Sequence, residues 1–308
     1  MSLFARADFH TAMYMEHLRN QGFKRYPENP FLEVYKMRDN LYSLLGRSPG
    51  GSRGSDAWMH LLIGPEKAML IDTGFGIGDL KALVDRLTGG MPVIVVNTHF
   101  HGDHTLGNSY FEKVYIHEYD ADMLRRPVTP ESRSRFIRAK DDPEYTFSEE
   151  DMAPIRPYDI IAVPDGYTFD LGQNYIIELI HIPGHTPGGC VYLDKQSRIL
   201  FSGDAILPTP IIITGPRGDG PYSEFGTVTA LSNALPKLKA KMDQFDVLYA
   251  GHSILEYTNM AVIGMMKACR DILRDPNDYL EAGDNGHGTP GYLMDEGATG
   301  IIYSMEKI

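Results

Sequence analysis

Short apolar runs separated by turn-forming residues dominate the chain and predict β-strands. In the first third of the sequence they lie at residues 32–37, 41–45, 57–63, 68–72 and 93–96. Later runs lie at 160–163, 175–182, 190–193, 199–202 and 246–249. Each run has the length of an ordinary strand and is bounded by glycine, proline or polar residues, which is typical of strands buried in a core.

Apolar residues spaced three and four apart predict helices between these strands. One such stripe covers 80–87 and ends at the glycine pair 89–90. The same spacing predicts helices at 227–242, kinked or interrupted at Pro236, and at 258–274, while residues 1–25 favour a helical lead-in. Strands that alternate with helices in this way indicate the α/β (α+β) class.

Composition divides the chain into three parts. Residues 1–30 are expected to form an N-terminal helical lead-in and linker, and residues 31–275 one large domain. Within that domain, residues 127–157 hold five prolines and many charges, which indicates an insertion with one short helix near 131–140. Residues 276–308 form a C-terminal tail, with a hairpin around 291–304, that we expect to pack on the same domain.

The charge and the cysteine content exclude several classes of partner. The formal net charge of the 308 residues is −12, and an acidic surface without a basic run argues against nucleic acid. No stretch reaches the roughly 18 apolar residues of a membrane-spanning helix, and residues 1–24 lack the apolar centre of a signal peptide. Cys190 and Cys269 make no disulfide framework. We therefore expect a cytoplasmic protein with a small-molecule substrate, and leave homo-oligomers open.

Seven residues of metal-ligand type stand in an ordered series along the chain. They are His99, His101, Asp103, His104, His185, Asp204 and His252. Together they include five of the 11 histidines. Imidazole and carboxylate suit zinc and neighbouring first-row metals. Seven ligands are too many for one tetrahedral ion, but they suit two ions that share a carboxylate.

The local sequence allows these side chains to converge. The first cluster follows directly on the predicted strand at 93–96, and each later ligand lies just beyond a strand end, where a loop can aim side chains into a shared cleft. His99 and His101 are two apart, so in an extended segment they face the same side and can bind one ion together. Asp204 offers two oxygens, the simplest way to bridge two ions about 3.5–4 Å apart.

In this order the motifs resemble those of the metallo-β-lactamase-fold hydrolases, above all the glyoxalase II-like branch. The matching segments are residues 70–74, 99–104, 183–188, 202–204 and 251–252. The resemblance implies a four-layer αββα sandwich over residues 31–275, with the ions at the sheet edge. The ligands that it assigns are His99, His101 and His185 for the first ion, Asp103, His104 and His252 for the second, and Asp204 as the bridge. It also implies that Asp72 supports the ligands from behind, a position that we extend to Thr186.

The activity implied by this resemblance is hydrolysis of a small carbonyl substrate. Two divalent ions, zinc first with iron or manganese as alternatives, would turn a bridging water into a hydroxide. That hydroxide would attack a thioester, ester, lactone or amide, with Asp103 and Asp204 as the carboxylates assigned to catalysis. Two other classes stay open: an iron-dependent oxidoreductase of the persulfide dioxygenase type, and a metal-binding protein without catalytic activity.

Differences between this sequence and particular members of the family make some classes of substrate less favoured. Dedicated β-lactamases of this fold lack a bridging aspartate where Asp204 sits. Homoserine lactonases carry a tyrosine shortly after that position, where this chain has none until Tyr222. Lys307 is the only lysine or arginine after Arg274, so the basic glutathione-binding set of glyoxalase II is missing. Cleavage of a glutathione thioester is accordingly disfavoured.

Two loops rich in glycine or proline are expected to form the walls of the substrate site. Residues 46–55 would act as a flap, with Trp58 near its base supplying an apolar contact, and residues 207–225 would form the opposite wall with Tyr222 on it. These loops, rather than the ligands, would decide which carbonyl compound is accepted.

Overall fold

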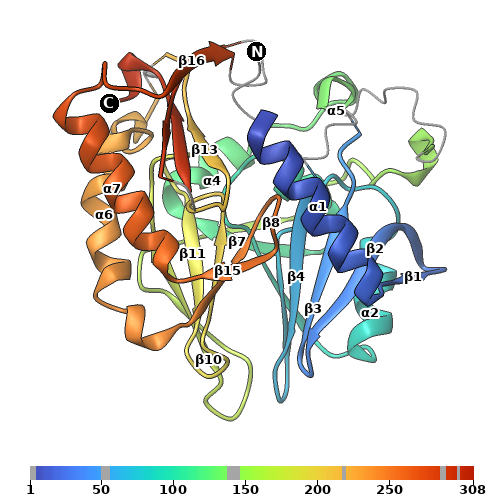
Figure 1. Ribbon diagram of the computed structural model, residues 1–308. Helices are drawn as coiled ribbons and strands as arrows, with labels where there is room; N and C mark the ends of the chain where they lie inside the picture. Colours follow the sequence, from blue (N-terminus) through green and yellow to red (C-terminus); the bar gives the residue numbers. More distant parts are fainter. Residues whose placement is uncertain (1–4, 50–55, 137–145, 217–219, 285–288, 297–298) are drawn as a thin grey trace.

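Two large β-sheets form the centre of the protein, seen in a computed structural model that describes residues 5–49, 56–136, 146–216, 220–284, 289–296 and 299–308 (Figure 1). The eight strands of the first sheet pair in chain order: β1 (Lys24–Tyr26), β2 (Asn29–Arg38), β3 (Leu41–Gly46), β4 (Ala57–Ile63), β5 (Ala68–Ile71), β6 (Val93–Val96), β7 (Lys113–His117) and β8 (Asp159–Val163). The second sheet has the order β15 (Glu256–Thr258), β14 (Val247–Ala250), β12 (Ile199–Gly203), β11 (Cys190–Asp194), β10 (Ile176–His181) and β9 (Thr168–Asp170).

A smaller third sheet contains the end of the chain. Its order is β13 (Pro210–Ile213), β18 (Gly300–Tyr303), β17 (Pro290–Asp295) and β16 (Glu281–Asp284). The antiparallel pair β17 and β18 is the hairpin expected near the C-terminus. Because β13 pairs with β18 in parallel, it fixes the final strands to a segment more than eighty residues earlier.

Several helices cover the outer faces of the sheets, whereas Met15 and Leu18 of the first helix pack into the apolar layer between the two large sheets. The helices are α1 (Ala5–Gln21), α2 (Leu80–Thr88), α3 (Gly102–Thr105), α4 (Glu118–Leu124), α5 (Pro130–Phe136), α6 (Val228–Lys239) and α7 (Met260–Arg274). In Figure 1, α6 and α7 lie side by side outside the second sheet, and α2 lies outside the first. Among the described residues, none of the helices has both the length and the apolar character needed to cross a membrane.

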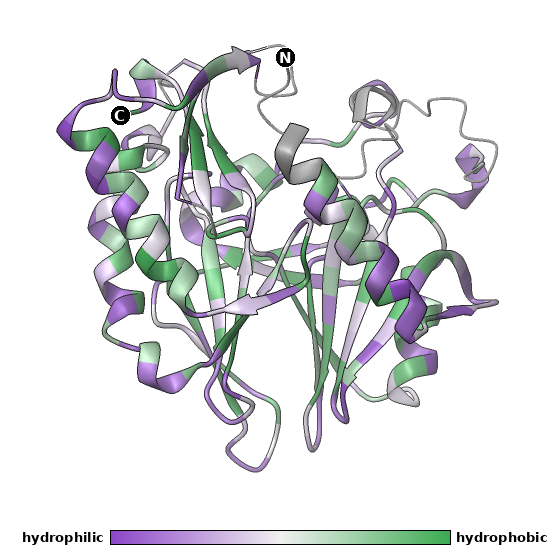
Figure 2. Cartoon of the chain, viewed as in Figure 1, coloured by the Kyte–Doolittle hydropathy of each residue, from purple (hydrophilic) through white to green (hydrophobic). Residues whose placement is uncertain are grey.

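Alternation along the strands builds the layered core. In β4, Trp58 and Leu62 point between the two large sheets, whereas Met59 and Leu61 point to the outer layer beneath α2. A third apolar layer fills the space between the second sheet and the helices α6 and α7. Figure 2 shows the same arrangement, with hydrophobic colour concentrated along the strands. The expected αββα sandwich is confirmed.

Most predicted elements are present, but several segments differ, and the short strands β1, β9, β15 and β16 were not predicted. The strand β7 and the helix α4 that follows it occupy a stretch for which the hydrophobic pattern gave no element. The expected loop at 207–225 contains β13, because its isoleucines pair with β18 and two of them, Ile211 and Ile213, enter the core. The interruption expected at Pro236 is absent, since α6 continues through it.

Candidate metal centre

The structure brings all seven ligand-type side chains to one edge of the two large sheets. Their ligand atoms form groups whose members all lie within 4.8 Å of one another. We call the group of His99, His101 and His185 the first set, and the group of Asp103, His104 and His252 the second set. A further group joins Asp204 to His99 and His104, and so connects the two sets.

Parallel strand pairs deliver these residues to the same place. In the first sheet β5 and β6 run in parallel, with Ile71 opposite Val96, so Asp72 and the segment before His99 emerge together. In the second sheet Gly203 of β12 lies opposite Ala250 of β14, so Asp204 and the segment before His252 also emerge together. The carboxyl ends of parallel strands are where α/β proteins usually bind ligands.

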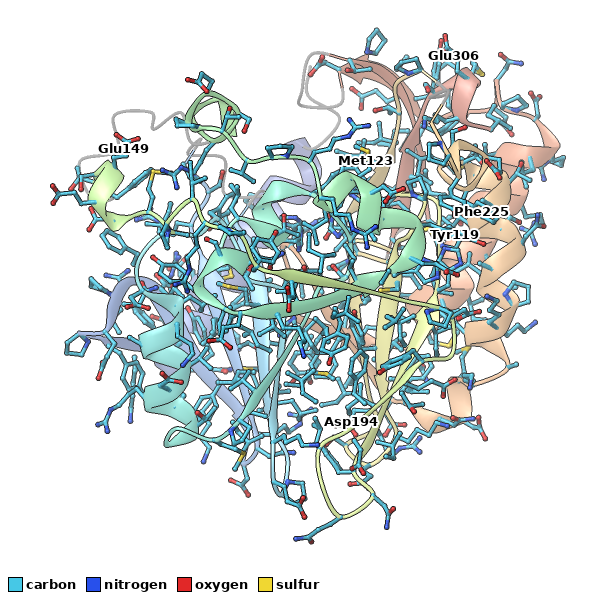
Figure 3. All side chains as sticks on the ribbon, turned by 180° about the vertical axis from the view of Figure 1, so that it is seen from behind. Tyr119, Met123, Glu149, Asp194, Phe225 and Glu306 are labelled. Carbon is cyan, nitrogen blue, oxygen red and sulfur yellow. The ribbon has the colours of Figure 1, made fainter. Side chains whose placement is uncertain are left out.

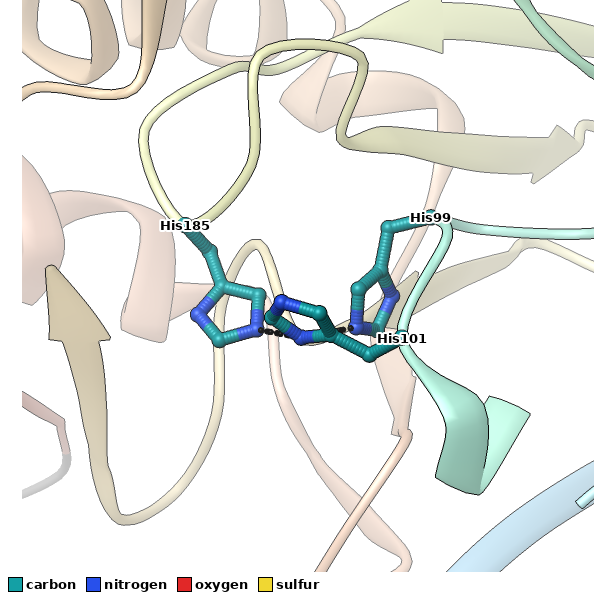
Figure 4. Close-up of side chains that lie close together, drawn as sticks. All are labelled: His99, His101 and His185. Atoms are coloured by element: carbon teal, nitrogen blue, oxygen red, sulfur yellow. Dashed lines mark hydrogen bonds between the residues drawn. The ribbon is translucent and has the colours of Figure 1, made fainter. Parts of the chain in front are cut away.

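Three ring nitrogens of the first set face one another. The Nδ1 atom of His101 lies 3.1 Å from Nε2 of His99 and 3.0 Å from Nε2 of His185 (Figure 4). Two of these histidines come from the segment after β6, and the third comes from the turn after β10. Convergence of this kind suits a cation that accepts lone pairs from all three rings.

In the second set the ligand atoms are similarly close. The Nε2 atom of His252 lies 3.1 Å from Nε2 of His104 and 3.2 Å from Oδ2 of Asp103. Asp204 lies between the two sets: its Oδ2 is 3.3 Å from Nε2 of His252 and 3.6 Å from Nε2 of His185. One carboxylate oxygen can therefore reach ligands of both sets.

The outer ring nitrogens are held by acceptors, which directs the inner nitrogens into the centre. Nδ1 of His104 donates to Oδ2 of Asp72 (2.9 Å), and Nδ1 of His185 donates to the carbonyl of Ile212 (2.8 Å). Nδ1 of His252 donates to the carbonyl of Asp56 (2.9 Å). A proton on the outer nitrogen leaves Nε2 with a free lone pair, the usual arrangement behind metal-binding histidines.

Two features around Asp204 also fit a metal centre. Its Oδ1 atom is buried and has no hydrogen-bond partner within the described part of the chain, although buried carboxylate oxygens are normally paired. A side chain at Gly251 would place its Cβ 2.4 Å from that oxygen, so the backbone approaches the centre as only glycine can. The residues present thus fit two divalent cations.

The two sets differ in their electrostatics. Burial, together with the neighbouring His185, lowers the pKa of His101 to about 3, and burial also lowers the pKa of His99 and of His185. The three imidazoles of the first set are therefore neutral at pH 7. Neutral imidazole is the form that binds a metal ion.

In the second set, nearby carboxylates raise the pKa values of the histidines, whereas those of the first set are lowered. Burial disfavours charge on His104 and His252, but Asp204 and Asp103 more than compensate, and they raise the pKa of His252 to about 10 and that of His104 above its usual range. Despite burial, the same two histidines hold the pKa of Asp204 well below its ordinary value. Without a cation, this pair of histidines carries a proton at neutral pH.

Asp72 lies directly behind the ligand-type residue His104. It is 2% exposed and accepts hydrogen bonds from the backbone N–H and the hydroxyl of Thr98, both at 2.8 Å, in addition to the one from His104. The Thr98 hydroxyl is also 3.0 Å from Nδ1 of His99. Asp72 thus contacts one ligand directly and another through Thr98.

Thr186 contacts a residue that sequence reasoning missed. Its hydroxyl donates to Oδ2 of Asp120 at 2.7 Å, and not to the backbone. Asp120 lies in the first turn of α4, is fully buried, and has its pKa raised to about 6 by burial in spite of the hydrogen bonds that it accepts. An acidic residue shortly after the short apolar run at 114–116 was the available signal.

Trp58 does not contact the open edge of the centre. It is 1% exposed, and its strand position points it between the sheets, where its ring lies 5.6 Å from that of Tyr35. Its indole N–H donates to the carbonyl of Ser253, and its backbone N–H to that of Gly251. The expected substrate contact is therefore corrected: Trp58 is a core residue that holds the backbone on both sides of His252.

Residues beside or within the two expected loops contact ligand-type histidines. Residues 50–55 of the first loop lie outside the described residues, but the carbonyl of Asp56, directly after that loop, accepts the hydrogen bond from His252. In the second loop, the carbonyl of Ile212 accepts the hydrogen bond from Nδ1 of His185. Tyr222 is 37% exposed and stacks on Tyr119 of α4, with ring centres 4.0 Å apart. Figure 3 shows Tyr119 beside Phe225 at the end of this loop.

Comparison with known proteins agrees with the site. Residues 53–252 match the family model described as the metallo-beta-lactamase superfamily. The acyl-coenzyme A thioesterase MBLAC2 of Bos taurus is 31% identical over 175 residues, which cover 52% of this chain and 61% of that protein. The match thus spans about three fifths of this relative's length. The hydroxyacylglutathione hydrolase GloC of Haemophilus influenzae is 27% identical, covering 61% of this chain and 80% of that protein.

A solved structure shows the same fold. The metallo-beta-lactamase from Pontibacter korlensis superimposes with a TM-score of 0.55 over 78% of this chain and 99% of its own, at 18% sequence identity. The motifs, the sandwich and the family match agree. The chain belongs to the metallo-β-lactamase superfamily.

Proposed function

We propose that this protein is a two-metal hydrolase, with zinc as the expected ion, that cleaves an acyl thioester. The observation that carries the proposal is the position of Asp204 between two complete sets of ligands. Its Oδ1 lies 3.6 Å from Nε2 of His104, and its Oδ2 lies near both His185 and His252. A single ion would not require a carboxylate that faces both sets.

Each set supplies three protein ligands of the kind found in catalytic zinc sites. With Asp204 shared, each ion would have four protein ligands, and water or substrate would enter as a fifth, a coordination number that catalytic zinc can reach. Two divalent ions bound there would supply a hydroxide at neutral pH and polarise a substrate carbonyl. Asp204 would balance the charge of both ions. Asp103, whose Oδ2 lies 3.2 Å from Nε2 of His252, would help to bind the ion of the second set.

The substrate class is inferred from the relatives and from leaving-group chemistry. MBLAC2 is named an acyl-coenzyme A thioesterase, and GloC a hydrolase of a glutathione thioester. Cleavage of a thioester releases a thiolate, whose conjugate acid has a pKa near 8.5 for a simple thiol. Such a leaving group departs without prior protonation. This suits a site that lacks a tyrosine soon after Asp204 in the sequence.

The test is a substrate panel run on protein of known metal content. The purified chain is stripped with a chelator, reloaded with zinc, and analysed for ions per chain. It is then assayed with an acyl-coenzyme A, a hydroxyacyl glutathione, a lactone and a simple ester. We expect two zinc ions per chain and a kcat/KM for the acyl-coenzyme A at least about tenfold above that for the oxygen ester.

Three results would contradict the proposal in different ways. Turnover of the lactone alone would keep the hydrolase and reject the thioester. Iron-dependent oxygen uptake with a persulfide would replace hydrolysis by oxidation. Two bound ions with no turnover across the panel would indicate a metal-binding protein without this activity.

A further inference from the structure

A second buried carboxylate, Asp120, lies behind the metal centre and is not one of its ligands. It accepts hydrogen bonds from the backbone N–H of Gly188 (2.6 Å), the hydroxyl of Thr186 (2.7 Å) and the backbone N–H of Phe100 (3.2 Å). Its side chain belongs to α4, the helix that the hydrophobic pattern did not predict. No ligand of either set comes from that helix.

The three donors belong to the two loops that carry the first set. Phe100 stands between His99 and His101, and Thr186 follows His185 directly. These loops lie more than eighty positions apart in the sequence. A single carboxylate thus joins the backbone that bears two of the imidazoles to the turn that bears the third.

The packing around Asp120 leaves little freedom for this arrangement. A Cβ at Gly188 would lie 2.5 Å from the backbone nitrogen of Asp120 and 2.7 Å from its Cβ, so the turn presses directly on α4. Thr186 is only 2% exposed, and Asp120 is fully buried. Water cannot readily take the place of the carboxylate in such a space.

Asp72 shows the same pattern on the other side of the centre. Each carboxylate accepts from one threonine hydroxyl, from at least one backbone N–H and from a third donor. The difference lies in what they hold. Asp72 contacts a ligand ring of the second set, whereas Asp120 contacts only the backbone and the threonine that frame the first set.

We propose that Asp120 is a positioning residue that sets the distance between His185 and the pair His99 and His101, and so determines ion affinity at the first set alone. The inference rests on the proposed metal centre, but it does not depend on which substrate is cleaved. Groups that orient metal ligands from outside typically change metal affinity by 10–100-fold when they are mutated.

The experiment measures ion binding at each set separately. His252→Ala leaves the first set intact, and His101→Ala leaves the second. In each background, the affinity for zinc is measured by competition with a chromogenic chelator, with and without Asp120→Asn. The amide nitrogen of asparagine would replace either Oδ1, which accepts from Gly188, or Oδ2, which accepts from both Phe100 and Thr186. At least one of the three hydrogen bonds is therefore lost.

We expect Asp120→Asn to weaken zinc binding about 10–100-fold in the His252→Ala background, and less than about threefold in the His101→Ala background. The visible spectrum of the cobalt-loaded first set should change as well. Asp122→Asn is the matched control, because Asp122 lies on the same helix with its side chain 67% exposed, and it should change neither affinity nor spectrum.

A merely structural effect would look different. Equal weakening in both backgrounds, or no weakening in either, would overturn the proposal. If Asp120→Asn does not fold, as judged by circular dichroism, Thr186→Val replaces it, since this change removes only one donor and should weaken the first set about threefold or more. Wild-type protein that binds fewer than two ions would instead refute the proposed metal centre itself.

Discussion

The two ligand sets of this centre are built from similar residues but stand in different electrostatic surroundings. The first set has three imidazoles, and burial keeps them neutral. The second has two imidazoles and Asp103, with Asp72 behind it, and these carboxylates together with Asp204 keep a proton on the histidine pair. The comparison teaches that the residues around the ligands, more than the ligand types, decide how a site behaves before an ion binds.

The two sets also differ in how they are held. Asp72 contacts a ring of the second set directly, whereas the first set is framed through Asp120 and the loop backbone. Each set joins residues from both halves of the sandwich, so its geometry depends on the packing of one sheet against the other. Asp204 is the shared element, and it gives the strongest means of testing the comparison.

Replacing Asp204 should affect both sets at once. Asp204→Asn keeps the shape of the side chain but removes the negative charge that faces both ions. Residues that orient metal ligands from outside change affinity or activity by up to about 100-fold when they are mutated, and a shared ligand should matter at least as much. We therefore expect kcat/KM to fall at least about 100-fold and the metal content to fall below two ions per chain. Metal analysis and steady-state kinetics test this, with the exposed Asp246→Asn as the control. Unchanged metal content and rate would show that Asp204 does not bridge.

Replacing Asp72 should separate the sets. Asp72→Asn removes the acceptor that orients His104, so zinc affinity at the second set should fall about 10–100-fold. The first set should weaken less, because Asp72 reaches His99 only through Thr98. The single-set backgrounds His101→Ala and His252→Ala resolve the two effects by chelator competition. A larger loss of zinc affinity at the first set than at the second would contradict the expected difference between the two sets.

Binding at the two sets should depend differently on pH. The pKa of His252 is raised in the empty second set, so a proton is present at neutral pH and competes with the ion. Affinity should therefore fall as the pH falls, about tenfold per unit for one displaced proton. The ion affinity of the first set, whose histidines have lowered pKa values, should change little between about pH 6 and pH 8. Calorimetry in buffers of different ionisation enthalpy counts the released protons, and equal release from both sets would contradict the difference.

The smallest expected effect concerns the substrate wall. Tyr222 stacks on Tyr119 and remains partly exposed near the second loop. We expect Tyr222→Ala to raise KM about threefold or more through a lost apolar contact, with metal content and kcat nearly unchanged. Steady-state kinetics on the preferred substrate provide the measurement, and Tyr279→Ala, at an exposed tyrosine elsewhere, is the control. A drop in kcat with a constant KM would place Tyr222 in the chemistry.

Much of the fold could be predicted because strand burial leaves a local signature. The runs that became β4 and β6 were recognised with their observed bounds, since both faces of these central strands are packed and every position is apolar or nearly so. The strand β13 and the helix α4 were missed. Their apolar residues sit among prolines, glycines and charges, and they are ordered by partners far away in the sequence.

Trp58 shows that the residues next to a side chain in the sequence do not by themselves predict what it contacts. A tryptophan beside a glycine-rich loop suggested a substrate contact. Its side of β4 faces the second sheet, however, and that choice follows from the register of the sheet as a whole.

By itself, the sequence determined the seven ligand-type residues, their order and their places at strand ends, because metal affinity requires particular chemical groups and glycines leave recognisable marks. The family resemblance implied how those residues divide between two sets and that Asp72 stands behind them. Only the tertiary structure showed that Asp120 joins the loops of the first set, because Asp120 contacts Thr186 and Gly188, which lie 66 and 68 positions further along the chain. Such contacts are fixed by packing between the sheets, and no local pattern in the chain records them.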